Sequence, residues 1–335
     1  MTAAIEEVRC TDRKVVLREI IDAAKPLVLR GLCQNWPLVR LARESDTAFA
    51  QELARHDNGT PVDALLIAPD AHGVIGYNAA MDGFNYEHFR VSVTDVLQRL
   101  AAYARAGNAP RGVAMQSALL AQCVPGLVAT HRVPFLDATV QPRLWIGNEV
   151  TTPAHFDSYH NIAVVACGRR RFTLFPPEQV KNLHVGPLDF APTAVAMSLP
   201  RLNAQEDPRW PHFKDALAHA QAAVLEPGDA IYVPPVWWHH VESLERLNAL
   251  VNFWWRSAAF SGHIAEPPLN ALMHCILAFK WMPEHEREAW LALLEHYVFN
   301  DADPAAHIPE ARRGVLGPLT PEIVAKLKQL SRTAS

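Results

Sequence analysis

Short apolar runs bounded by turn-forming residues dominate the middle of the chain. The longest run is almost continuously apolar, as expected of a strand buried on both faces. A glycine, Gly168, follows it and can turn the chain, and the next run ends at Pro176. This pattern predicts a β-rich core of short strands separated by turns. The runs are residues 144–146, 161–167, 169–175, 230–234 and 248–255.

Helical periodicity flanks this β-rich segment on both sides. The pattern predicts helices over 11–24, 47–55 and 93–105 before it, with a strand at 62–68, and helices over 269–279, 284–299 and 321–330 after it. Thr11 and Thr320 stand where N-cap residues are expected, and Pro321 stands at the first helical position. The predicted organisation is a mixed α/β lead-in (1–110) packed on the core, a β core (111–260) and a C-terminal helical region (261–335).

The C-terminal helices carry more apolar side chains than helices exposed on all sides need. They include Leu272, Ile276, Trp281 and Trp290. Two interpretations stay open, since these side chains can pack on the core of the same chain or form the face of a homodimer.

Composition excludes several classes of protein. Half of the 335 residues are hydrophobic, which is ample for a large core, and the net charge of −4 gives no basic excess for nucleic-acid binding. No apolar run approaches the roughly 20 residues of a membrane span, and the N-terminus lacks the apolar segment of a signal peptide. The five cysteines are widely spaced without a C-x-x-C pair, so we expect free thiols and a cytoplasmic protein.

Candidate metal ligands occur at His155, Asp157 and His239. In a strand, residues two apart face the same way, so His155 and Asp157 can aim at one point. A distant third ligand, His239, completes a two-histidine, one-carboxylate set, which holds one side of Fe(II) and leaves the other side open. His240 then points to the opposite face. A single His-X-Asp pair is a weak signal in a chain with 16 histidines, but each candidate lies beside a predicted strand.

The motifs around these residues resemble the JmjC-type, cupin-like 2-oxoglutarate oxygenases, and most closely the subgroup of the asparaginyl hydroxylase known as factor inhibiting hypoxia-inducible factor. The resemblance is carried by five segments and extends over roughly residues 110–256. It implies a double-stranded β-helix (jelly-roll) core, mainly β with flanking helices. The segments are LWIGNEVTTPAHFD (144–157), GRRRFTLFPP (168–177), EPGDAIYVPP (226–235), WWHHVES (237–243) and VNFW (251–254).

The resemblance also implies cosubstrate-binding positions. Thr152 matches a hydroxyl that contacts 2-oxoglutarate, and Asn161 and Asn252 match polar residues of the pocket. Arg170 stands where the family usually has a lysine that binds the distal carboxylate. Alternation places Arg170 on the same face as Phe172 and Leu174, so it is expected to point inward and to need an anionic partner. A family tyrosine that reaches the cosubstrate is replaced, in the best match, by Ala114.

The implied activity is an Fe(II)- and 2-oxoglutarate-dependent dioxygenase. The resemblance implies that dioxygen is consumed, that 2-oxoglutarate becomes succinate and CO2, and that a substrate C–H bond is hydroxylated, most directly on a protein side chain. Two alternatives stay open: a small-molecule or amino-acid hydroxylase of the same chemistry, and a non-catalytic metal- or ligand-binding cupin. Sequence does not name the protein, peptide or small-molecule substrate.

Overall fold

The computed structural model describes residues 2–10, 16–106, 112–192, 195–256 and 267–333. The chain divides into two compact units, Met1–Trp255 and Arg256–Ser335. Strands predominate in the first unit, and the described part of the second unit is helical. The predicted class, mainly β with flanking helices, is confirmed. The predicted cap at Thr11 lies outside the described residues.

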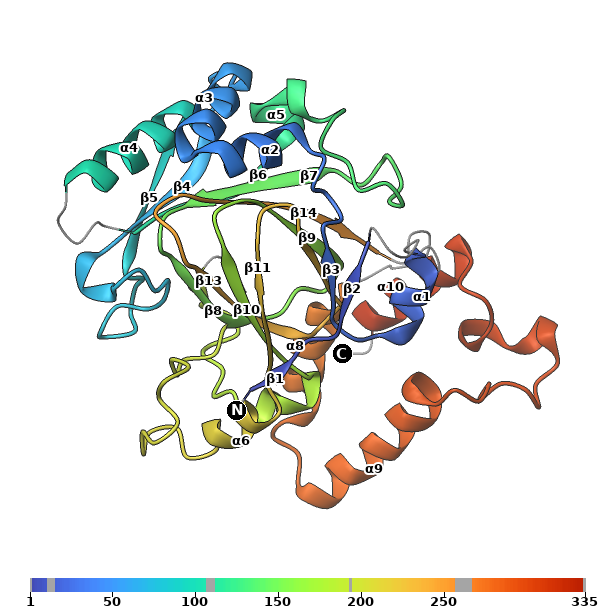
Figure 1. The fold of residues 1–335 in the computed structure, drawn as a ribbon. Helices are drawn as coiled ribbons and strands as arrows, with labels where there is room; N and C mark the ends of the chain where they lie inside the picture. Colours follow the sequence, from blue (N-terminus) through green and yellow to red (C-terminus); the bar gives the residue numbers. More distant parts are fainter. Residues whose placement is uncertain (1, 11–15, 107–111, 193–194, 257–266, 334–335) are drawn as a thin grey trace. The chain divides into compact units, whose positions relative to one another are not determined.

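Two β-sheets build the first unit (Figure 1). Among the described residues, the smaller sheet has five strands in the order β1-β11-β10-β13-β8, and the larger has nine in the order β2-β3-β12-β9-β14-β7-β6-β4-β5. The strands are β1 (Ala3–Ala4), β2 (Glu7–Arg9), β3 (Leu27–Arg30), β4 (Val62–Ile67), β5 (Tyr86–Val91), β6 (Gly112–Leu119), β7 (Pro142–Gly147), β8 (Thr151–His155), β9 (His160–Cys167), β10 (Arg170–Phe175), β11 (Gln221–Leu225), β12 (Ala230–Val233), β13 (Trp238–Ser243) and β14 (Asn248–Trp255).

Apolar side chains fill the space between the sheets. Phe172 and Leu174 of β10 pack there with Val165 of β9 and Ile231 of β12. Every residue of β9 is buried, as the continuous apolar run predicts. Gly168 has a φ of +69° in the turn that joins β9 to β10, a conformation that favours glycine.

Helices cover the other face of the larger sheet (Figure 1). The predicted helix 47–55 is found as α3, capped by the Ser45 hydroxyl, which accepts from the Ala48 N–H at 3.0 Å. The pattern missed α2, a short helix that begins at a proline. The helices of this unit are α1 (Leu17–Ala23), α2 (Pro37–Glu44), α3 (Asp46–His56), α4 (Val93–Ala106), α5 (Leu120–Cys123) and α6 (Phe213–Ala218).

A buried histidine ties α2 to a distant loop. His131 is fully buried; its Nε2 accepts the Leu38 N–H of α2 at 3.4 Å, and its Nδ1 lies 3.0 Å from the Leu127 carbonyl oxygen. Burial lowers the pKa of His131 from 6.5 to about 4, so the ring stays neutral in the folded protein at pH 7.

We therefore expect an acid-sensitive contribution to stability from His131. Between pH 6.5 and about 4 the unfolded chain binds this proton and the folded chain does not, so the free energy of unfolding falls as the pH falls. The loss across this window is roughly 3 kcal/mol. Urea titrations of wild type and His131→Gln over this range should show a shallower pH slope in the variant. Equal slopes would contradict the assignment.

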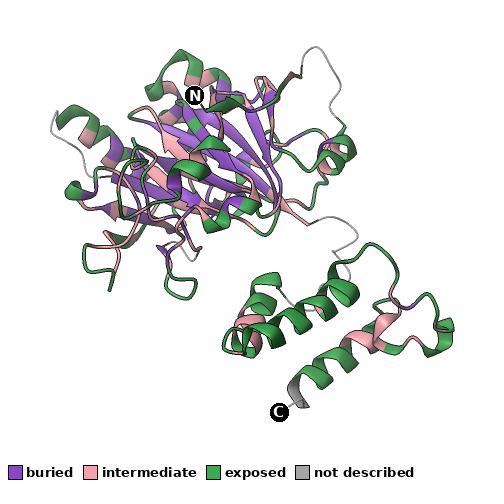
Figure 2. Ribbon diagram, turned by 90° about the horizontal axis from the view of Figure 1, so that it is seen from below, coloured by how far each residue is buried: buried purple, intermediate pink, exposed green. Residues whose placement is uncertain are grey.

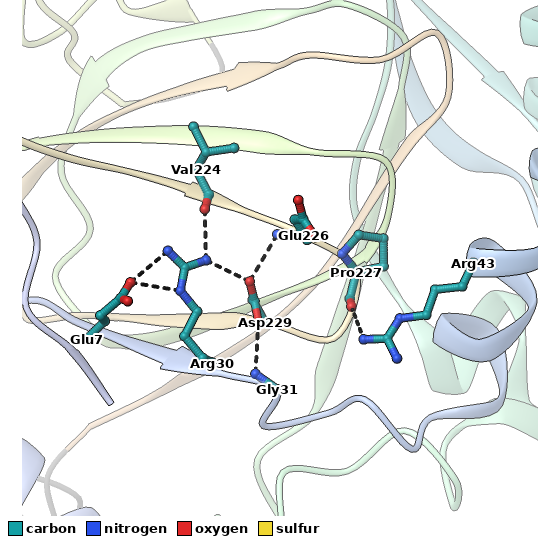
Figure 3. A network of polar contacts seen from close by, with 8 residues as sticks. All are labelled: Glu7, Arg30, Gly31, Arg43, Val224, Glu226, Pro227 and Asp229. Atoms are coloured by element: carbon teal, nitrogen blue, oxygen red, sulfur yellow. Dashed lines mark hydrogen bonds and ion pairs between the residues drawn. The ribbon is translucent and has the colours of Figure 1, made fainter. Parts of the chain in front are cut away.

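Asp229 organises the turn between β11 and β12 and joins it to β3 (Figure 3). Its carboxylate accepts from Arg30 Nη1 at 2.7 Å, from the Gly31 N–H at 2.8 Å and from the Glu226 N–H at 3.2 Å. Arg30 also pairs with Glu7 at 2.8 Å. The turn at residues 226–229 thus joins strands that lie far apart along the chain.

Removing the Asp229 carboxylate should destabilise the fold. Because Asp229→Ala leaves Arg30 and two N–H groups without their acceptor, we expect a loss of about 2–4 kcal/mol in the free energy of unfolding. Glu7→Gln is the matched control, since the Glu7 side chain is 54% exposed and its loss should cost about 1 kcal/mol or less. Chemical denaturation would show similar midpoints for the two variants if the network in Figure 3 contributed little.

The second unit contains the three predicted C-terminal helices. They are α8 (Pro268–Phe279), α9 (Glu284–Leu294), which continues as a π-helical turn (Glu295–Phe299), and α10 (Pro321–Thr333). Thr320 caps α10 as predicted, because its hydroxyl accepts from the Ile323 N–H at 3.3 Å. α8 and α9 contain no buried residue, and Figure 2 colours the residues of the second unit mostly as exposed, with some intermediate. Among the described helices, none has the length and apolar character needed to cross a bilayer.

Candidate active site

Strands β8 and β13 bring the predicted metal ligands together. His155 and His239 are direct partners in this antiparallel pair, and their ring centroids lie 4.2 Å apart. Asp157 follows β8, and its Oδ2 lies 3.6 Å from His239 Nε2. Residues separated by more than eighty positions therefore meet because two strands are adjacent.

Both histidine rings are oriented by the backbone. Nδ1 of His155 lies 2.9 Å from the Pro153 carbonyl oxygen, and Nδ1 of His239 lies 3.1 Å from the Trp237 carbonyl oxygen. A carbonyl only accepts, so each Nδ1 carries the proton and donates it. Burial, followed by the proximity of His239, lowers the pKa of His155 to about 4. In the neutral form of each ring, Nε2 then carries a lone pair, and this is the form that binds a metal.

Asp157 is positioned from two sides. Trp254 of β14 donates its Nε1–H to Asp157 Oδ2 at 3.1 Å, and the Asp157 carbonyl accepts the Val236 N–H at 2.8 Å. Val236 has a φ of +66°, which is strained for a β-branched residue. Sequence reasoning missed this contact, although alternation along β14 places Trp254 on the same face as Asn252.

The chemistry of these three side chains fits a hard or borderline divalent metal. Two ligand atoms at about 2.1 Å from one ion lie roughly 3–4 Å apart, which agrees with 3.6 Å between Asp157 and His239. Among the described residues, however, no group of three or more His, Cys, Asp and Glu side chains stands close enough together to form a complete metal cluster. The Asp157–His239 distance fits a shared metal ion, but the three side chains do not stand close enough together to form a complete site.

A β-bulge places Thr152 beside His155. The pairing with β13 shifts between His239, opposite His155, and Val241, opposite Thr152, so β8 contains one extra residue. Pro153, which has no N–H to donate to the ladder, stands in this bulge. Thr152 and His155 are three positions apart, and simple alternation would put them on opposite faces. Both instead line one cavity of about 750 Å³, together with Asp157, Trp145 and Trp254.

Arg170 is buried without an anionic partner. It lies on β10 with Phe172 and Leu174, which face the space between the sheets, as alternation predicts. Its Nε has no hydrogen-bond partner, and no carboxylate of the described residues forms an ion pair with it. Burial lowers the pKa of Arg170 to about 10, so the side chain is still charged at pH 7. Arg170 is not part of the wall of the 750 Å³ cavity.

Asn161 and Asn252 form a pair on neighbouring strands. Asn252 Nδ2 donates to Asn161 Oδ1 at 3.3 Å, and Trp145 Nε1 donates to Asn252 Oδ1 at 2.8 Å. Neither amide lines the cavity, whereas Trp145 does. These contacts make Asn252 a residue that orients the Trp145 side chain.

A family model for the cupin-like domain matches residues 13–260. The chain belongs to the cupin-like family. The predicted JmjC-type, cupin-like membership is therefore confirmed. Family membership does not assign the individual ligands, which rest on the geometry above.

Named relatives of this cupin-like chain include a Jumonji C domain-containing protein and a lysine-specific demethylase. HSPB1-associated protein 1 from Homo sapiens is 34% identical over 152 residues, 44% of this chain and 30% of the relative. Lysine-specific demethylase JMJ31 from Arabidopsis thaliana is 33% identical over 127 residues, 37% and 22% of the two chains. Jumonji C domain-containing protein 5 from Drosophila melanogaster is 26% identical over 245 residues, 70% and 55%. The matched region spans less than two thirds of each relative's length.

The remaining wall of the 750 Å³ cavity contains aromatic and acidic side chains. Phe84 stacks on Tyr86 and on Phe190, with centroid distances of 5.4 and 4.9 Å. Asp63 and Asp189 also line the wall, and no lysine or arginine does so in the part of the chain that the structure describes. Sequence reasoning missed this wall because its members come from segments without a shared motif.

Proposed function

We propose that this chain is an Fe(II)- and 2-oxoglutarate-dependent dioxygenase that hydroxylates a side chain of a protein. His155, Asp157 and His239 would hold the iron. The observation that carries the proposal is the pair of adjacent histidines whose Nδ1 atoms lie within hydrogen-bond distance of carbonyl oxygens, with the Nε2 of His239 3.6 Å from Asp157 Oδ2. Rings held through Nδ1 in this way leave Nε2 for a metal ion.

When bound, iron with 2-oxoglutarate and dioxygen would supply the oxidation, giving succinate and CO2. The residues of this chain would bind the iron and the cosubstrate and orient them. Trp254 holds the Asp157 carboxylate in place, Thr152 offers a hydroxyl inside the cavity, and Arg170 supplies a cation that can offset a buried carboxylate. Because Arg170 stands outside the cavity wall, its contact with the cosubstrate would need a side-chain rearrangement. Asn252 and Asn161 keep Trp145 in the cavity wall.

The cavity wall favours a protein side chain with a positive charge. Aromatic faces and carboxylates attract ammonium and guanidinium groups. Within the described residues neither lysine nor arginine lines this cavity, although Arg143 packs on Trp254 at 5.6 Å. A free small molecule of the same charge is the second candidate, since a cavity of about 750 Å³ also accommodates one.

Two further proposals concern assembly and location. We propose that α8 and α9 form a homodimer face, because Leu277, Trp281 and Phe299 are 80%, 84% and 74% exposed. Sedimentation showing a monomer at micromolar concentration would remove that proposal. We also propose a cytoplasmic location, where the five free cysteines would remain reduced.

Succinate formation tests the function. Wild type, Asp157→Ala and Trp254→Phe are incubated with Fe(II), 2-oxoglutarate and oxygen, with and without basic peptides. We expect iron-dependent succinate from wild type, none from Asp157→Ala and a reduced amount from Trp254→Phe. A +16 Da shift on a peptide would support the protein substrate, whereas a shift only on a small cation would favour the second candidate. Absence of succinate from wild type under all conditions would leave the non-catalytic cupin.

A further inference from the structure

A second cavity, of about 640 Å³, lies on the opposite face of the strand pair that carries the candidate metal ligands. Alternation along β13 turns His240 and Glu242 toward this second cavity and His239 to the other face of the strand. On β8, Thr151 and Pro153 line the second cavity, while Thr152 and His155 line the first. Segments 74–85 and 197–210 form the remaining walls.

We call the second cavity the outer cavity. Three buried polar atoms of the residues that line it lack a hydrogen-bond partner. They are His240 Nδ1, Glu242 Oε2 and Asn78 Oδ1, half of the six such side-chain atoms found in the described part of the chain. His240 is only 6% exposed. Because buried polar atoms are nearly always paired, their concentration in one cavity indicates that something other than this chain completes them.

The charged side chains around the outer cavity indicate which charged groups a bound ligand would carry. Glu242 lies 3.6 Å from Arg171, and Arg209 is paired with Asp207 at 2.6 Å. Arg201 at the rim donates only to the Ala71 carbonyl, at 3.4 Å, and forms no ion pair within the described residues. Glu242 Oε2 is the atom that faces Arg171 Nη1 at 3.6 Å, a separation too long for a hydrogen bond. Asn78 Oδ1 and Glu242 Oε2 are both acceptors, so a ligand that completes them carries N–H donors there and a carboxylate near Arg201.

The rest of the cavity wall is apolar and favours a ligand with an apolar side chain. Met81, Met197, Leu199, Leu202 and Trp210 line it, and its volume is in the range of small-molecule sites and far above that of a few waters. We propose that the outer cavity binds an amino-acid-like zwitterion: an ammonium group on Glu242 and Asn78, a carboxylate on Arg201, and an apolar side chain against the methionines. This site is separate from the proposed oxygenase chemistry and does not depend on it.

Calorimetric titration of the full chain tests the proposal without iron or 2-oxoglutarate. The probes are L-leucine, L-methionine and L-phenylalanine, with isoamylamine and isocaproate as leucine analogues that lack the carboxylate and the amine. We expect at least one amino acid to bind with a Kd below about 1 mM, and each analogue to bind at least about 10-fold more weakly than leucine. Absence of binding by all three amino acids up to about 10 mM would overturn the site.

Variants locate the binding. Glu242→Gln keeps the shape of the side chain and removes its charge. Arg201→Gln should leave the fold intact, because the Arg201 side chain is exposed. Each should weaken binding by at least about 10-fold, the value of one charge-assisted hydrogen bond. Glu245→Gln, which removes a surface ion pair with Arg169, is the matched control and should change the Kd less than 2-fold. Unchanged binding in Glu242→Gln, or a crystal structure in which waters alone complete the three atoms in the presence of leucine, would overturn the proposal.

Discussion

Replacing His239 with alanine is expected to abolish iron binding and succinate formation. His239 is the residue that contacts both other candidate ligands, with its ring 4.2 Å from that of His155 and its Nε2 3.6 Å from Asp157. Loss of an outer-sphere partner typically costs 10–100-fold in metal affinity, so loss of a ligand should cost at least about 100-fold. Iron content after desalting and succinate yield are the two measurements.

His212→Ala is the matched control for this variant. His212 is a histidine on the surface, with a 65% exposed side chain, and its removal should leave iron content and turnover unchanged. Iron content of His239→Ala equal to that of wild type would place the metal elsewhere. Equal loss in both variants would show that the assay follows general damage and not the ligand set.

Replacing Arg170 with methionine is expected to have two opposite effects. The folded protein without ligands should become more stable, because a buried charge with no anionic partner is replaced by an apolar chain of similar length. The lowering of the Arg170 pKa from 12.5 to about 10 corresponds to a cost of roughly 3 kcal/mol at pH 7, so a gain of about 1–3 kcal/mol is expected after the loss of some packing. Binding of 2-oxoglutarate should weaken by at least about 30-fold.

The combination separates two roles for Arg170. If the guanidinium serves the cosubstrate, thermal melting should show a higher Tm for the unliganded Arg170→Met protein and a smaller rise in Tm with 2-oxoglutarate than wild type shows. Arg170→Lys keeps the charge and should retain part of the ligand effect. A lower Tm with unaltered 2-oxoglutarate binding in Arg170→Met would mean that Arg170 is a structural residue.

Much of the fold could be predicted because the local pattern and the tertiary structure agree. The run 161–167 is apolar on both faces and is buried on both faces as β9, and the helix predicted at 93–105 appears as α4. Helix α2 was missed although Leu38, Val39, Leu41 and Ala42 follow the spacing of one helix face, because the segment is only eight residues long and begins at a proline. Its stability comes instead from contacts such as the one from His131, which no local pattern contains.

The sequence by itself determined the β core, the ends of several helices, the inward direction of Arg170 and the identity of the candidate ligands His155, Asp157 and His239. These follow from periodicity, turn chemistry and motif, all of which act between near neighbours in the chain. Only the tertiary structure decided that Trp254 holds Asp157, that a bulge turns Thr152 to the same cavity as His155, and that a second cavity lies behind the same strands. The physical reason is that strand register, bulges and cavity walls depend on which distant segments lie side by side, and a linear pattern does not contain that information.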